Sequence, residues 1–114
     1  MSVVTPFPGP RDRQAVAAFE RLELQRILDL YGRMVAAGHW RDYGLSFHPD
    51  VAIFAAFRRA TERPEVRIEK RPSLRTKQGA FALVGEHGAV LKRGHDLIGV
   101  MAPLERRLMR LVGE

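Results

Sequence analysis

The residues best suited to chemistry lie near the C-terminal end, where an apolar run meets Lys92, Arg93, Gly94, His95 and Asp96. The Gly permits a sharp turn, and the His-Asp pair is suited to opening a helix that follows. A helix N-terminus favours anions through its free N–H groups and its dipole, and neighbouring cations strengthen that preference. This spacing indicates a phosphate or carboxylate site at a strand-to-helix junction.

Two other interpretations of this junction stay open. In the simpler one, Asp96 or His95 is only a helix cap, and Lys92 and Arg93 are solvated. In the other, His95 is a general base oriented by a carboxylate, which requires a nucleophile and an oxyanion site. The sequence contains no Walker loop, dinucleotide fingerprint or nucleophile elbow that would supply them. We therefore predict no catalytic residue and favour a binding module over an enzyme.

Positive charge is concentrated in the middle of the chain. The net charge is +6, and Lys plus Arg against Asp plus Glu count 6 against 6 over residues 1–50, 8 against 3 over 51–80 and 5 against 4 over 81–114. A local excess favours a surface that meets an anionic partner, although a basic face without a dedicated ligand is the alternative. The predicted anion-binding residues form one basic patch: Arg58, Arg59, Lys70, Arg71, Arg75, Lys77, Lys92, Arg93 and His95.

Composition excludes several kinds of site. The chain has no cysteine, which rules out disulfides, thiolate metal sites and cysteine nucleophiles. Its 4 His residues are scattered without a pair on one helical face, so we predict no metal site and no cofactor. No apolar run approaches the roughly 20 residues that span a bilayer, and no signal-peptide pattern opens the chain. We expect a cytoplasmic protein that does not enter a membrane.

Hydrophobic periodicity defines the elements that must position these residues. The Pro-rich residues 1–18 are expected to form a mobile tail, followed by a single globular domain over residues 19–114. Apolar residues at three- and four-residue spacing predict one helix over about 20–37 and a second over about 96–111. Pro103 should kink the second helix or divide it into two, because it lacks a backbone donor.

Five strands are predicted between the helices. Strict alternation predicts half-buried strands over 43–47 and 65–71, and the apolar run over 51–57 predicts a central strand covered on both faces. Two short strands, 80–84 and 89–91, complete the set. Short connections permit only antiparallel neighbours, so the sequence predicts an α+β fold in two layers: an N-terminal helix, a five-stranded antiparallel meander and a C-terminal helix.

Polar residues of the predicted sheet have competing interpretations. Glu65, Arg67, Glu69 and Arg71 are expected to form an alternating-charge row on the outward face of their strand. The segment 85–88 reads Gly-Glu-His-Gly, which matches the backbone-gripping loop of KH domains, but its place between two strands indicates a hairpin turn.

A dense cluster follows the first helix, reading Trp40-Arg41-Asp42-Tyr43. A buried Trp at this point would close one end of the core. Exposed, the same cluster would suit a protein interface or base stacking. We favour closure of the core.

Six segments in one order resemble a known family of small alphaproteobacterial proteins classed as a domain of unknown function. These segments are 30–38, 40–43, 57–59, 67–70, 77–79 and 91–97, and the likeness covers about residues 19–111. The resemblance implies one small bacterial domain. It carries no activity, cofactor or site residue.

We therefore hold three hypotheses about function. The first is a small basic, non-enzymatic binding module whose patch docks RNA or a ribonucleoprotein. The second is a protein–protein adaptor or assembly subunit that uses the Pro-rich tail and one sheet edge or helix face. The third is a small-anion or nucleotide-binding enzyme that uses His95 and Asp96. The sequence predicts no particular oligomeric state.

Overall fold

A computed structural model describes residues 16–60 and 63–113. The predicted tail over residues 1–18 lies largely outside these ranges, except that Ala17 is buried and donates its N–H to the His48 carbonyl at 2.9 Å. The elements follow in the order α2 (Arg21–Ala36), β1 (Asp42–Phe47), β2 (Ala52–Phe57), β3 (Val66–Lys70), η1 (Pro72–Leu74), β4 (Phe81–Gly85), β5 (Val90–Gly94) and α3 (Leu97–Leu111).

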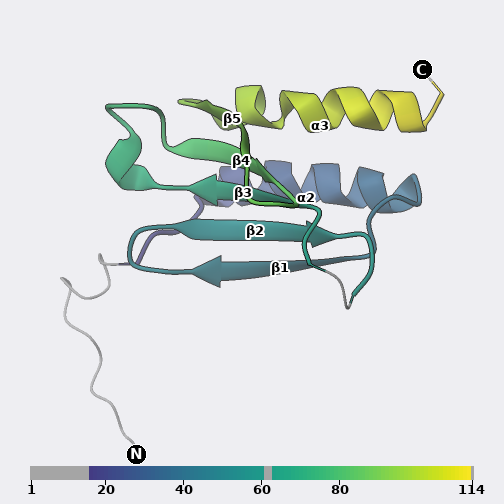
Figure 1. Ribbon diagram of the computed structural model, residues 1–114, viewed down its shortest axis with the longest axis horizontal. Coiled ribbons are helices and arrows are strands. Elements are labelled where there is room, and N and C mark those ends of the chain that lie inside the picture. The colour runs from purple at the N-terminus through teal and green to yellow at the C-terminus, as the bar shows by residue number, and fades with distance from the viewer. Residues whose placement is uncertain (1–15, 61–62, 114) are drawn as a thin grey trace, which may run out of the picture.

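The strands form one antiparallel sheet in the order β1-β2-β3-β4-β5, which confirms the predicted meander. Both helices lie on the same face of this sheet and run in the same direction (Figure 1). The α+β class and the two layers are therefore confirmed. We call the face without helices the open face.

Both helices begin where local side chains satisfy free backbone N–H groups. At α2, Glu20 and Glu23 form a capping box. At α3, the Asp96 carboxylate accepts hydrogen bonds from the N–H groups of Ile98 at 3.2 Å and Gly99 at 3.1 Å. The division expected at Pro103 is not observed, because α3 continues through it as one helix.

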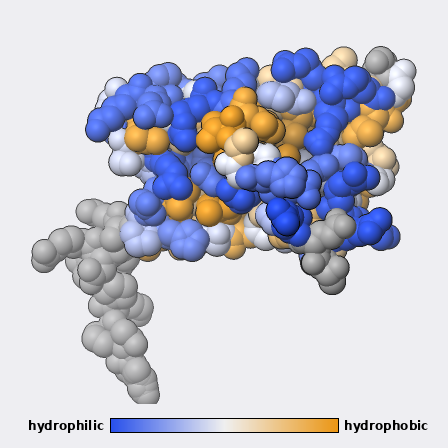
Figure 2. Space-filling view, in the orientation of Figure 1, coloured by the Kyte–Doolittle hydropathy of each residue, from blue (hydrophilic) through white to orange (hydrophobic). Residues whose placement is uncertain are grey.

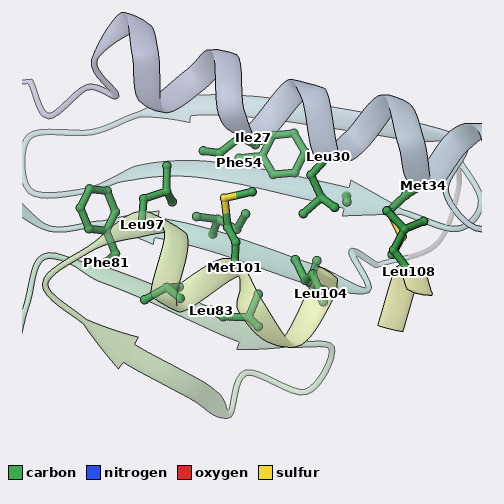
Figure 3. Close-up of a cluster of buried hydrophobic side chains, with 14 of the residues drawn as sticks. Ile27, Leu30, Met34, Phe54, Phe81, Leu83, Leu97, Met101, Leu104 and Leu108 are labelled. Atoms are coloured by element: carbon green, nitrogen blue, oxygen red, sulfur yellow. The ribbon is translucent and has the colours of Figure 1, made fainter. Parts of the chain in front are cut away.

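The core lies between the helices and the sheet. Side chains of α2, the inner face of the sheet and α3 meet there, including Ile27, Phe54, Leu83 and Leu104 (Figure 3). Trp40 is only 1% exposed and closes one end of this core, as predicted.

The prediction that the second strand is covered on both faces is wrong. Ala52, Phe54 and Ala56 are buried, but the alternate residues of β2 on the open face are only half-buried. The cause is that both helices pack on one side. Figure 2 looks onto the sheet with α2 behind it and α3 along the top, and apolar side chains gather there near the middle between hydrophilic ones.

The junction before α3 also differs from the prediction. β5 extends to Gly94, so Lys92 and Arg93 lie in a strand, and Gly94 pairs with Phe81 without forming a turn. The glycine that the geometry requires is Gly79, with φ of 101°, because a Cβ there would lie 2.3 Å from the Gly94 carbonyl carbon.

Candidate functional site

The predicted basic residues do not form one patch. Arg58 and Arg59 follow β2 at one end of the sheet, whereas Lys70 pairs with Ala52 at the other end. The six residues between them along β2 correspond to roughly 20 Å. Lys92 and Arg93 lie on the edge strand β5, opposite Leu83 and Ala82. The predicted basic residues therefore lie at two ends of the sheet and do not form one continuous surface.

Two of the predicted cations serve structural ion pairs. Lys70 Nζ lies 2.8 Å from Glu23 Oε1 on α2, and both side chains are largely buried. Arg71 lies 3.3 Å from Asp50 and 3.6 Å from Glu69. These contacts connect the sheet to α2 and to the β1–β2 turn. Neither cation can therefore bind another anion unless one of these ion pairs breaks.

The charged row predicted on β3 is only partly as expected. Glu69 does form ion pairs with both Arg67 and Arg71. It is only 8% exposed between these two cations. Glu65 does not belong to this row. It precedes β3, and its carboxylate contacts Trp40 instead.

His95 and Asp96 have partners of their own. The Asp96 carboxylate is occupied as the N-cap of α3, and His95 Nδ1 lies 3.2 Å from the Arg75 carbonyl oxygen. These contacts fit the helix-cap interpretation of the junction. Arg75 and Lys77 are exposed, and neither forms an ion pair with the described part of the chain. One guanidinium nitrogen of Arg93 is buried without a hydrogen-bond partner there.

The densest polar cluster surrounds Glu65, at the end of the sheet that holds Arg58 and Arg59. Trp40 Nε1 donates to Glu65 Oε1 at 2.7 Å, and Arg107 Nη2 on α3 lies 3.0 Å from the same oxygen. His39 Nε2 lies 3.3 Å away and is buried, but its geometry is not that of a hydrogen bond. Glu65 thus connects the end of α2, the start of β3 and α3.

Burial and neighbouring charges set the protonation of this cluster. Burial acts to raise the pKa of Glu65, but the hydrogen bonds from Trp40 and Arg107 outweigh it and the pKa is lowered. Burial lowers the pKa of His39, and the charges of Arg107 and Arg58 add to that effect against the attraction of Glu65. At neutral pH Glu65 is therefore ionised and His39 is neutral.

A pocket of about 220 Å³ opens beside this cluster. We call it the His39 pocket. Among the described residues its lining carries no carboxylate, and it consists of Gly38, His39, Arg41, Arg58 and Arg59. Arg41 and Arg58 are exposed and form no ion pair with the described residues. Convergent guanidinium groups without a neutralising partner can bind a phosphate or a carboxylate.

Sequence reasoning identified Arg58 and Arg59 but missed His39, Glu65 and Arg107 as their neighbours. The available signal was the Trp40-Arg41-Asp42-Tyr43 cluster, which places a cation directly after the buried Trp. Arg41 donates its backbone N–H to the Phe57 carbonyl at 2.9 Å, which brings it beside Arg58. The proximity of Arg41 and Arg58 follows from the register of β1 on β2, which the sequence alone does not give.

The described ranges lack two further features. They contain no group of three or more His, Cys, Asp or Glu residues placed to hold a metal ion. They also contain no helix long and apolar enough to cross a membrane.

The fold and the site together define a two-layer α+β domain with a cationic pocket at one end of its sheet. The chain belongs to the family described as Protein of unknown function (DUF2794), whose model matches residues 17–101. No curated protein and no solved structure matches the chain.

Proposed function

We propose that this protein is a small basic binding module that docks RNA, alone or in a ribonucleoprotein, through the His39 pocket. The observation that carries the proposal is the convergence of Arg41 and Arg58 on a pocket lined without a carboxylate in the described residues. RNA phosphates match this chemistry, because guanidinium groups bind phosphate oxygens in pairs of parallel hydrogen bonds.

The surroundings of the pocket hold its lining residues in place. The cluster around Glu65 holds Trp40 and Arg107 in place, so the pocket rests on a rigid support.

Fluorescence anisotropy with a labelled single-stranded RNA tests the proposal. The double variant Arg41→Ala/Arg58→Ala should weaken binding about tenfold, which corresponds to about 1.4 kcal/mol. The matched control is Arg75→Ala/Lys77→Ala, which removes the same charge at the other end of the sheet and should change affinity little. Absence of binding at low salt, or equal weakening by both pairs, would exclude this pocket as the binding site.

A second candidate, a protein–protein adaptor, is favoured by a groove of about 480 Å³ between α2 and α3. Its lining includes Leu22 and Ile98, which are 56% and 55% exposed. The two-pronged ion pair of Arg33 with Glu105, at 3.0 and 2.9 Å, marks its far end. Such a groove suits an amphipathic helix. A stoichiometric protein partner that survives high salt and nuclease, and is lost in Ile98→Lys, would support this alternative.

A further inference from the structure

No strand of the described residues pairs with the outer edge of β1. β1 is the terminal strand of the sheet and pairs regularly with β2 over six positions, from Asp42 to Phe47. It contains no Pro, Lys or Arg. The opposite edge strand, β5, carries Lys92 and Arg93 and has a register shift at Leu83 and Val84. Proteins normally guard free edges with such features, and β1 lacks them.

The backbone groups that point away from the sheet can be assigned by position. His48 donates its N–H to the Val51 carbonyl at 2.9 Å, so residues of even number in β1 bond to β2. The N–H and C=O groups of Tyr43, Leu45 and Phe47 therefore face outward. Consistent with this, among the described residues the partner of the Tyr43 N–H is a side chain, Asp42 Oδ1 at 2.8 Å.

The same edge exposes apolar side chains. Tyr43 and Phe47 are 40% and 47% exposed. The ring centroids of Tyr43 and of Tyr31 on α2 are 4.8 Å apart, so the apolar surface continues from the strand to the helix. Leu28 and Val35 share the helix face of Tyr31 by their spacing, and Val35 is 41% exposed. A partner for this β1–α2 surface would have to cover both a strand edge and a helix flank.

We propose that a second copy of this chain docks on this surface, with the two β1 strands antiparallel about a two-fold axis at Leu45. In this register Tyr43 lies opposite Phe47 of the partner subunit. Asp42 lies opposite His48 of the partner subunit, so a carboxylate meets an imidazole. All outward N–H and C=O groups then find partners, because residues 43, 45 and 47 face one another.

Symmetry makes this pairing self-consistent. A two-fold axis perpendicular to the sheet keeps both helix layers on one side, so the two α2 helices flank the new junction. An added peptide strand would satisfy the backbone edge but would leave Tyr31 and Val35 uncovered. The result is one continuous sheet built from two five-stranded sheets. This inference does not depend on RNA binding.

Disulfide trapping tests the register directly, because the chain has no cysteine. Leu45→Cys places its thiol at the two-fold axis, where paired Cα atoms about 5.5 Å apart permit a disulfide. On oxidation it should form a covalent dimer. Ser46→Cys, one residue along, is the control and should stay monomeric on a non-reducing gel. Equal cross-linking of both variants, or none in either, would overturn the proposed register.

Analytical ultracentrifugation tests the surface itself. The natural chain should sediment as a dimer and Phe47→Lys as a folded monomer, with folding checked by circular dichroism. Ile98→Lys adds the same charge at a similarly exposed position on α3 and should remain dimeric. A natural chain that stays monomeric up to millimolar concentration, or a dimer that survives Phe47→Lys, would refute the proposal. If Phe47→Lys does not fold, the disulfide result decides.

Discussion

At the scale of single residues, Glu65 connects three parts of the fold through one carboxylate oxygen. Replacing it with Ala would leave the buried Trp40 N–H and the Arg107 guanidinium without their acceptor. We expect Glu65→Ala to lower the free energy of unfolding by about 2–4 kcal/mol. Urea denaturation measures this loss. Glu86→Ala, which removes an exposed carboxylate nearby, should stay within about 0.5 kcal/mol of the natural chain, and equal losses in both variants would contradict the role of Glu65.

His39 should make stability depend on pH. Its pKa is lowered in the folded state by burial and by Arg107 and Arg58. As the pH falls below about 6.5, the unfolded chain therefore takes up a proton at this position before the folded chain does. Stability contributed by His39 is present above that pH and is lost as the pH falls toward the folded pKa, by at most about 1.4 kcal/mol per pH unit.

The variant His39→Gln isolates this effect. Urea denaturation at several pH values between 5 and 7.5, a window chosen around the ordinary His pKa of about 6.5, should show a shallower loss for His39→Gln than for the natural chain. Glu65, which faces His39, has a lowered pKa and keeps its charge throughout this window. Parallel curves for the two proteins would mean that His39 titrates alike in both states.

At the scale of elements, the close approach of the loop at Gly79 to the end of β5 should be the least tolerant backbone position. A Cβ at Gly79 would lie 2.3 Å from the carbonyl carbon and oxygen of Gly94, and its φ of 101° is also unfavourable for other residues. Gly88 has a similar φ of 88°, but a Cβ there would meet no atom of the described residues within 4 Å. Gly88→Ala should cost about 1 kcal/mol of stability from strain alone, and Gly79→Ala a further 1–3 kcal/mol, roughly, from overpacking.

Thermal denaturation of the two Ala variants gives this comparison. The pair is matched because each removes a glycine at positive φ from a connection between elements. If Gly79→Ala and Gly88→Ala lower the stability equally, the close contact between Gly79 and Gly94 adds nothing to the cost of the substitution.

The elements themselves were largely predictable from sequence, for identifiable reasons. The apolar spacing of α2 and α3 and the short connections between strands leave a meander as the only simple topology, and Asp96 and Gly38 mark helix ends with local chemistry. The length of β5 was not predictable in the same way. Lys92 and Arg93 carry no strand pattern, and only pairing with β4 makes them part of the sheet.

At the scale of the whole molecule, the candidate site depends on register, which sequence patterns do not contain. Arg58 follows the last residue of β2 and Lys70 pairs with the first, so they lie at opposite ends of the sheet, whereas Arg41 and Arg58 line one pocket although they are further apart in sequence. The middle third of the chain is basic, yet the sheet divides its charge between two ends. The partner of Glu65 on α3, Arg107, likewise depends on how the helix packs.

The salt dependence of RNA binding tests the central claim most directly. For single-stranded RNA, a plot of log binding constant against log salt concentration has a negative slope, and its magnitude decreases by about 0.7 for each phosphate contact removed. The double variant Arg41→Ala/Arg58→Ala should therefore bind with a slope shallower by about 1.4 than that of the natural chain. A slope unchanged in this variant would show that RNA does not occupy the His39 pocket.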